Sequence, residues 1–154
     1  MTGVAPVAGD VAPDFVLTDT HGTPVELRAL RGAPVLAVFV PFAFSGTCTG
    51  ELCELRDNLA LFTEAGVELL VISTDPVFSL KAWAQQEGYT FALLSDFWPH
   101  GAVAKEYGVF DENRGMAVRG SFLIDAEGVV RWSVVNSPGE PRDLSGYREA
   151  LASL

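Results

Sequence analysis

The chain has 154 residues, of which 49% are hydrophobic and 19% charged, with 20 acidic side chains against 10 basic ones. This composition is typical of a folded globular protein and excludes a disordered chain. The formal charge of -10 repels the phosphate backbone of a nucleic acid, and no stretch reaches the ~18 consecutive apolar residues of a membrane span. The first residues resemble no secretory signal. We therefore expect a single cytoplasmic domain over residues 1–154, with no nucleic acid and no membrane among its partners.

The first predicted elements are strands. Residues 13–32 alternate apolar and polar side chains around a turn signal at Gly22, which predicts an N-terminal β-hairpin. Residues 34–40 (PVLAVFV) and 67–73 (VELLVIS) are continuous apolar runs, typical of strands that are covered on both faces.

The segment between these two runs predicts one helix. Cys48, Leu52, Leu55, Leu59 and Phe62 follow the spacing of a single helical face, and a glycine shortly afterwards ends the pattern. A buried strand, a helix and a second buried strand together form a βαβ unit.

A second such unit follows. Its helix is predicted to have Asp75 as N-cap, Pro76 as first helical residue and Gly88 as terminator. Residues 91–96 then predict a short strand, and residues 100–108 a short helix.

The last predicted elements are a hairpin and a helix. Residues 120–125 and 128–135 form two strands around the turn signal AEG, and residues 142–154 form a closing amphipathic helix. The element order ββ-βα-βα-ββ-α fits an α/β protein of the thioredoxin-like fold. In that fold a mixed central sheet has a parallel centre, an antiparallel hairpin at one edge and helices on both faces.

The two cysteines of the chain lie close together in the segment PFAFSGTCTGELC, residues 41–53. Cys48 falls at the start of the predicted helix, where the free backbone N–H groups and the helix dipole favour a thiolate, the nucleophilic form of the side chain. The Ser45 and Thr47 hydroxyls can donate to this sulfur or to a substrate oxygen, and Pro41 can shield the site. The alternative is that Cys48 is a small core residue on the Leu stripe.

Cys53 lies five residues further along the same predicted helix, turned by about 140° and about 8.6 Å away between Cα atoms. A disulfide needs a Cα separation below about 7 Å, so the pair can bond only if the start of the helix unwinds. Cys53 is therefore either an inert side chain or a resolving thiol that attacks oxidised Cys48. A metal site is disfavoured, because C-x2-C spacing is absent and the two histidines lie in separate segments.

The motif formed by Pro41, Ser45 and Cys48 resembles the P-x-x-x-[T/S]-x-x-C motif of the peroxiredoxins. The resemblance extends through GDVAPDFVLTDTHGTPVELRALRG, LLSDFWPHGAVAKEYGVF and RGSFLID. Within that family the chain is most similar to the alkyl hydroperoxide reductase E group of actinobacterial type.

This resemblance implies that Cys48 attacks a peroxide O–O bond and becomes a sulfenic acid, with Arg119 stabilising the thiolate and holding the peroxide. Glu51 matches a glutamate that orients such arginines. The alternative, to which we give equal weight, is that Glu51 is an acidic side chain that stabilises the first turn of the helix. Hydrogen peroxide and organic hydroperoxides are the implied substrates. No metal, flavin or other cofactor is implied.

The resemblance also implies partners. The reductant would be an external thiol of the thioredoxin, mycoredoxin or low-molecular-weight type, and the protein would form a homodimer through the loops around the site. Some members of the group work with one cysteine, whereas the C-x4-C spacing of Cys48 and Cys53 resembles the bacterioferritin comigratory protein group, where the second thiol resolves the first.

Two other functions are compatible with the fold. A thioredoxin-like disulfide reductase would use C-x-x-C, and the spacing here argues against it. A redox-inactive binding or chaperone module could share the fold, because fold alone does not define function. The combination of Pro41, Ser45, Cys48 and Arg119 favours the peroxidase.

Overall fold

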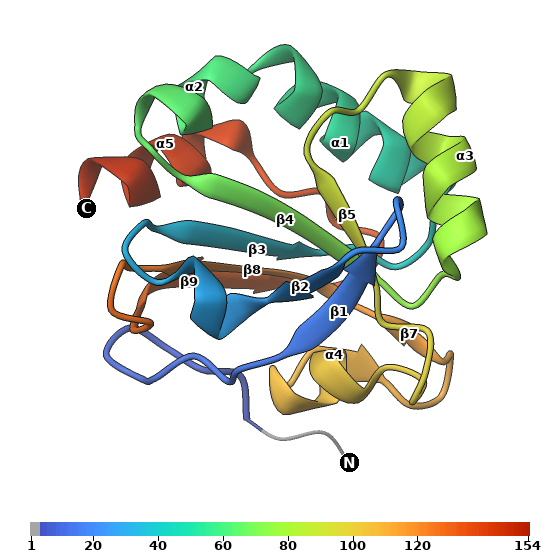
Figure 1. The fold of residues 1–154 in the computed structure, drawn as a ribbon, viewed down its shortest axis with the longest axis horizontal. Helices are drawn as coiled ribbons and strands as arrows, with labels where there is room; N and C mark the ends of the chain where they lie inside the picture. The colour runs from blue at the N-terminus through green and yellow to red at the C-terminus, as the bar shows by residue number, and fades with distance from the viewer. Residues whose placement is uncertain (1–3) are drawn as a thin grey trace.

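A computed structural model describes residues 4–154 and shows a twisted sheet with helices on both faces (Figure 1). The elements are, in chain order, β1 (Val16–Asp19), β2 (Pro24–Glu26), the 3-10 helix η1 (Leu27–Leu30), β3 (Val35–Phe39), α1 (Gly46–Asp57), α2 (Leu59–Glu64), β4 (Glu68–Ser73), α3 (Val77–Glu87), β5 (Ala92–Ser95), α4 (Ala102–Glu106), β6 (Phe110–Asp111), β7 (Met116–Ala117), β8 (Arg119–Ile124), β9 (Val130–Asn136) and α5 (Leu144–Ala152).

The strand order in the main sheet is β2-β1-β5-β4-β3-β8-β9. The central strands β3, β4 and β5 are parallel, and the strands outside them pair antiparallel. This confirms the mixed sheet with a parallel centre and the N-terminal hairpin at one edge. The β8–β9 hairpin forms the opposite edge, so both edges are antiparallel.

The sheet separates two apolar cores. Helices α1, α2, α3 and α5 lie over one face, and α4 with the N-terminal segment covers the other (Figure 1). All five residues of β3 are buried because its alternate side chains enter opposite cores, as the continuous apolar run predicts.

The single helix expected after β3 is in fact two helices, α1 and α2. They meet at Asn58, whose backbone leaves the helical region with φ -119° and ψ 23°. The Asn58 side-chain amide donates to the Glu54 carbonyl at 2.8 Å. Asparagine competes for backbone hydrogen bonds in this way, which explains the break inside an otherwise continuous apolar pattern.

The start of α3 also differs from the expectation. Pro76 is the N-cap and Val77 the first helical residue, so Asp75 does not cap the helix. Its carboxylate instead accepts from the Ala43 backbone N–H at 2.8 Å and from the Ser73 hydroxyl at 2.7 Å. Asp75 thereby ties the loop after β3 to the end of β4.

Candidate active site

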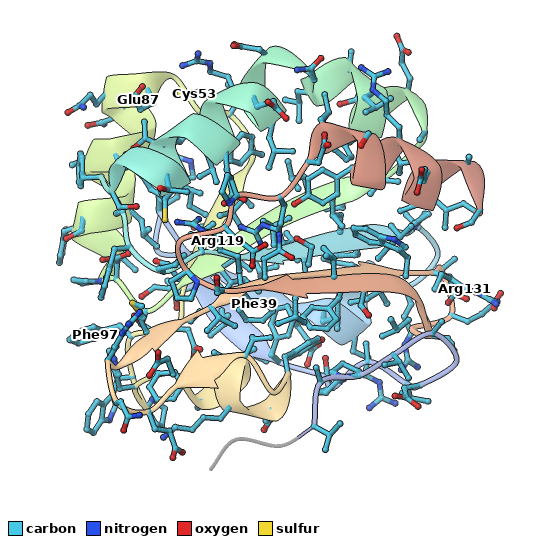
Figure 2. The ribbon with its side chains drawn as sticks, turned by 180° about the vertical axis from the view of Figure 1, so that it is seen from behind. Phe39, Cys53, Glu87, Phe97, Arg119 and Arg131 are labelled. Carbon is cyan, nitrogen blue, oxygen red and sulfur yellow. The ribbon has the colours of Figure 1, made fainter. Side chains whose placement is uncertain are left out.

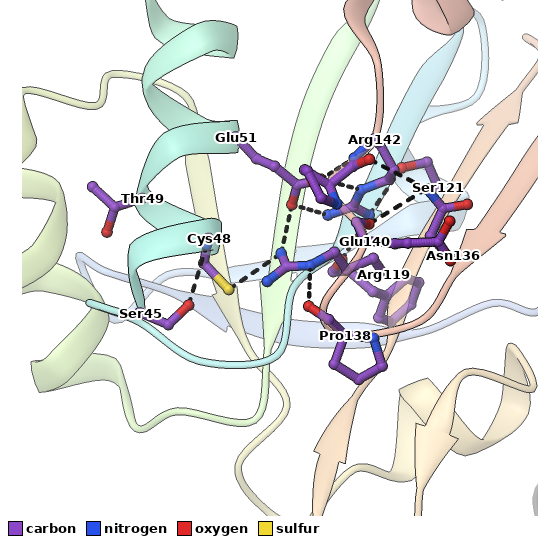
Figure 3. A network of polar contacts seen from close by, with 12 residues as sticks. Ser45, Cys48, Thr49, Glu51, Arg119, Ser121, Asn136, Pro138, Glu140 and Arg142 are labelled. Atoms are coloured by element: carbon purple, nitrogen blue, oxygen red, sulfur yellow. Dashed lines mark hydrogen bonds and ion pairs between the residues drawn. The ribbon is translucent and has the colours of Figure 1, made fainter.

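Cys48 lies in the first turn of α1, which follows β3 after the connecting residues 40–45. Its side chain is fully buried. Ser45 is the N-cap, and its hydroxyl oxygen accepts a hydrogen bond from the Cys48 backbone N–H at 3.1 Å (Figure 3). The expected position at a helix start is confirmed, and the cap fixes the sulfur relative to the helix axis.

Arg119 reaches the sulfur from the neighbouring strand. It begins β8, the antiparallel partner of β3, and its side chain is 2% exposed. Its Nη1 donates to Cys48 Sγ at 3.4 Å and to a Glu51 carboxylate oxygen at 2.6 Å, while Nε donates to the Pro138 carbonyl at 2.7 Å (Figure 3). A guanidinium held on three sides is a fixed source of positive charge beside the sulfur.

Glu51 lies one helical turn after Cys48, and its carboxylate is shared by two arginines. Arg142 is the second: its Nε and backbone N–H donate to one oxygen at 3.0 and 2.6 Å, and its Nη2 donates to the other at 2.7 Å. Burial alone would raise the pKa of Glu51, but the hydrogen bonds and charge of Arg142, with the charge of Arg119, hold that pKa below its usual value.

Arg142 is itself buried between the strands. Its Nη1 donates to the carbonyls of Phe39 at 2.7 Å and Gly120 at 2.9 Å. Burial would lower its pKa, but the hydrogen bond to Glu51 raises it. Sequence reasoning missed this residue. Arg142 lies in the loop before α5, where no periodicity indicates which side chains turn inward, and its only signal is a basic residue in an acidic stretch.

Aromatic side chains flank the first turns of α1. Phe44, at a left-handed φ of 68°, packs against the buried Trp83 with ring centroids 6.2 Å apart. Trp83 Nε1 donates to the Thr49 hydroxyl at 3.2 Å, which ties α1 to α3. Pro41 is buried between β3 and this loop.

Cys53 lies on a different side of α1. It faces the end of α3, with its sulfur 3.5 Å from a Glu87 carboxylate oxygen and 3.6 Å from the Tyr89 hydroxyl (Figure 2). Both cysteines are free thiols. Since Cys48 contacts β8 and Cys53 contacts α3, the intact helix keeps the two thiols turned apart.

The comparisons with known proteins agree with this geometry. A model of the AhpC/TSA family matches residues 8–133. Alkyl hydroperoxide reductase E of Mycobacterium tuberculosis is 50% identical over 147 residues, covering 95% of this chain and 96% of that protein. Peroxiredoxin Bcp of Escherichia coli is 41% identical over 129 residues, covering 80% of this chain and 81% of that protein.

Solved structures give the same result. The crystal structure of Peroxidoxin BcpB from Mycobacterium tuberculosis is similar with a TM-score of 0.84 and 34% identity over 96% of both chains. Enterococcus faecalis AhpC is similar with a TM-score of 0.87 and 28% identity, covering 96% of this chain and 91% of that one.

The thioredoxin-like fold, the family match and these relatives together place the chain in the class of thiol-dependent peroxidases. The chain belongs to the AhpC/TSA family, within which its relatives are peroxiredoxins and alkyl hydroperoxide reductases. It is a thiol-dependent peroxidase. Among residues 4–154, no helix has the length and apolar character needed to cross a membrane.

Proposed function

We propose that Cys48 is the nucleophile of this peroxidase and that it reduces hydrogen peroxide and organic hydroperoxides. The thiolate sulfur attacks one peroxide oxygen, an S–O bond forms as the O–O bond breaks, and water or an alcohol leaves. Cys48 is oxidised to a sulfenic acid as the peroxide is reduced. The 3.4 Å contact between Arg119 Nη1 and Cys48 Sγ, inside a buried helix start, is the observation that supports this role.

The surrounding residues have separate roles in this proposal. Arg119 stabilises negative charge on the sulfur and on the departing oxygen. The Ser45 oxygen accepts from the Cys48 backbone, so its hydroxyl hydrogen is available for a peroxide oxygen. Pro41 shields the site from water. Glu51 holds Arg119 in place and does not touch the substrate.

The nucleophile can be tested by stopped-flow tryptophan fluorescence on mixing the reduced protein with hydrogen peroxide or tert-butyl hydroperoxide. Cys48→Ser should abolish the rapid oxidation, because a hydroxyl is a far weaker nucleophile than a thiolate. Cys53→Ser is the matched control and should retain it. Rapid oxidation that persists in Cys48→Ser would remove the assignment.

For the return half of the cycle, we propose that Cys53 resolves the sulfenic acid of Cys48. The resulting disulfide is then reduced by an external thiol of the thioredoxin, mycoredoxin or low-molecular-weight type. Support comes from the position of both free thiols in one helix. Mass spectrometry after one equivalent of peroxide tests this step: persistent sulfenic acid in place of the disulfide would favour a one-cysteine cycle.

We also propose that the protein is a cytoplasmic homodimer. A pair of free cysteines suits a reducing compartment. Large aromatic side chains are exposed in the segments that follow the carboxyl ends of the parallel strands, and such side chains are typical of interfaces. They are Phe42, Phe44, Phe78, Phe97 and Trp98.

A further inference from the structure

The surroundings of Cys53 form a small polar cluster at the end of α3. Glu87 is the last residue of that helix, and Gly88 in the left-handed conformation turns the chain so that Tyr89 follows on the same side. Both side chains contact the Cys53 sulfur, and the thiol donates to Glu87 Oε1 at 3.5 Å. The peroxide-reducing step at Cys48 uses none of these groups.

Glu87 is held in an orientation that leaves one oxygen for the thiol. Its Oε2 accepts from the Gln86 side-chain amide at 3.2 Å, and its backbone carbonyl accepts from Arg56 Nη1 at 2.6 Å. Arg56 Nη1 also lies 4.0 Å from Glu87 Oε1. The Glu87 side chain is 22% exposed, so a proton that the carboxylate accepts can pass on to solvent.

Three ionisable groups face Cys53: Glu87 at the end of α3, Tyr89 just beyond it and Arg56 on α1 itself. Burial raises the pKa of Tyr89, with the hydrogen bond to Cys53 adding to the effect, so the phenol keeps its proton. A guanidinium is already protonated at neutral pH. Of the three, Glu87 is therefore the group able to accept a proton.

We propose that Glu87 is a catalytic residue of disulfide formation: it is the general base that takes the proton of Cys53. This rests on the resolving role of Cys53 proposed above. As the Cys53 S–H bond breaks, its proton moves to Glu87 Oε1 and its sulfur attacks the sulfur of the Cys48 sulfenic acid. The S–S bond forms, the S–O bond breaks, and the oxygen leaves as water once it has taken up a proton. Cys53 is oxidised and the sulfenic sulfur is reduced.

The arrangement also explains which thiol moves. Cys53 is anchored against α3, whereas the disulfide requires the first turns of α1 to unwind. In the intact helix the Tyr89 hydroxyl donates to the Thr49 carbonyl at 3.4 Å, next to Cys48. When that turn unwinds, the hydroxyl loses this acceptor and becomes free to donate to the Cys53 thiolate. The unwinding that brings Cys48 to Cys53 thus also frees the hydroxyl that stabilises the attacking Cys53 thiolate.

The test is the rate of Cys48–Cys53 disulfide formation after one equivalent of peroxide, followed by rapid quench and mass spectrometry. Glu87→Gln should leave the oxidation of Cys48 unchanged and slow disulfide formation by about 100-fold, the low end of what a positioned base contributes. Glu64→Gln, which removes the same charge from the exposed end of α2, should match the wild type.

The pH profile separates a base from a structural support. In Glu87→Gln the disulfide rate should rise about tenfold per pH unit near neutrality, because solvent must ionise the thiol, whereas the wild-type profile should be flat there. If Glu87 merely anchors the helix, the variant would form the disulfide faster, and that result overturns the proposal. An unchanged rate and profile would overturn it too.

The resolving role of Cys53, on which the base depends, is tested by a different outcome. A wild type that forms no disulfide, with the same turnover in Cys53→Ser, would exclude a resolving Cys53 and with it the base. A wild type that forms the disulfide at the same rate as Glu87→Gln would exclude only the base.

Discussion

Glu51 is the residue on which the geometry of the site depends. Its two oxygens accept from Arg119 and Arg142, so one carboxylate fixes both guanidiniums, and Arg119 in turn contacts the sulfur. The side chain is 6% exposed. A buried group with this many charged partners has large effects when it is removed, because the partners remain buried.

Replacing Glu51 with Gln should destabilise the protein by about 3–5 kcal/mol at neutral pH, since two buried guanidiniums lose their counter-charge. It should also slow the oxidation of Cys48 by peroxide. Urea unfolding and stopped-flow fluorescence measure the two effects. Glu54→Gln, on the exposed side of the same helix, is the control and should change neither.

The same carboxylate predicts a pH dependence of stability. The pKa of Glu51 is lowered in the folded protein, so the unfolded chain binds its proton first as the pH falls. The stabilisation is therefore complete above the unfolded pKa, 4.5, and is lost as the pH falls through the lower, folded pKa. The difference in unfolding free energy between wild type and Glu51→Gln should shrink over that window, and a constant difference would contradict the assignment.

At the level of elements, the first turn of α1 both holds Cys48 in place and is the part that must unwind before Cys48 can reach Cys53. Its Ser45 cap and the Arg119 contact hold Cys48 at the start of the helix. The bond from Trp83 Nε1 to Thr49 clamps the same turn to α3, and that turn must open before Cys48 can reach Cys53. In the proposed resolving step, a weaker clamp should let this turn open more often and so speed disulfide formation.

Thr49→Val should therefore accelerate disulfide formation by about fivefold, because it removes the acceptor of a hydrogen bond worth about 1 kcal/mol while keeping the shape of the side chain. The same quenched-flow measurement reads the rate. Thr63→Val on α2, whose hydroxyl donates to the Leu59 carbonyl, is the control and should leave it unchanged. Slower disulfide formation in Thr49→Val would argue against a clamp.

The sequence predicted those elements that are marked by a long run of apolar residues. Strands β3 and β4 are continuous apolar runs, and both are found as expected. The β6–β7 pair was not predicted, because strands of two residues show no periodicity. The break at Asn58 was missed because the apolar stripe runs across it, although the asparagine itself was a signal.

The site was predictable to the extent that its residues belong to a motif or a regular element. The family resemblance singled out Pro41, Ser45, Cys48 and Glu51 within one stretch, and Arg119 next to the strand expected at residues 120–125. Arg142 belongs to a loop, where burial is decided by tertiary packing. The contact of Cys53 with Glu87 likewise depends on how α1 packs on α3, which spacing alone does not specify.

At the level of the whole molecule, the exposed aromatics lie at one end of the sheet. Parallel strands β3, β4 and β5 have their carboxyl ends together, and the segments after them carry Phe44 and Trp98 in loops and Phe78 at the start of α3. Phe78 and Trp98 are 84% and 81% exposed. The surface is otherwise acidic, with a formal charge of -10, so two copies repel each other except through apolar contact.

The proposed homodimer should therefore dissociate when charge is added to that end. Sedimentation equilibrium should show a dimer for the wild type, tighter at high salt because screening reduces the repulsion, and a monomer for Trp98→Glu. Val16→Glu, exposed on β1, is the control and should remain a dimer. A wild type that sediments as a monomer would exclude this assembly.

The parts of the site are far apart in the order of synthesis. Arg119 follows Cys48 by 71 residues, and Arg142 follows Glu51 by 91. A chain still being made therefore carries Cys48 without either guanidinium. A thiol without such a neighbouring positive charge reacts slowly with peroxide. With the roles proposed for Cys48 and Arg119, rapid reaction with peroxide should begin only after β8 pairs with β3 and the loop before α5 is inserted, so that a nascent chain escapes oxidation.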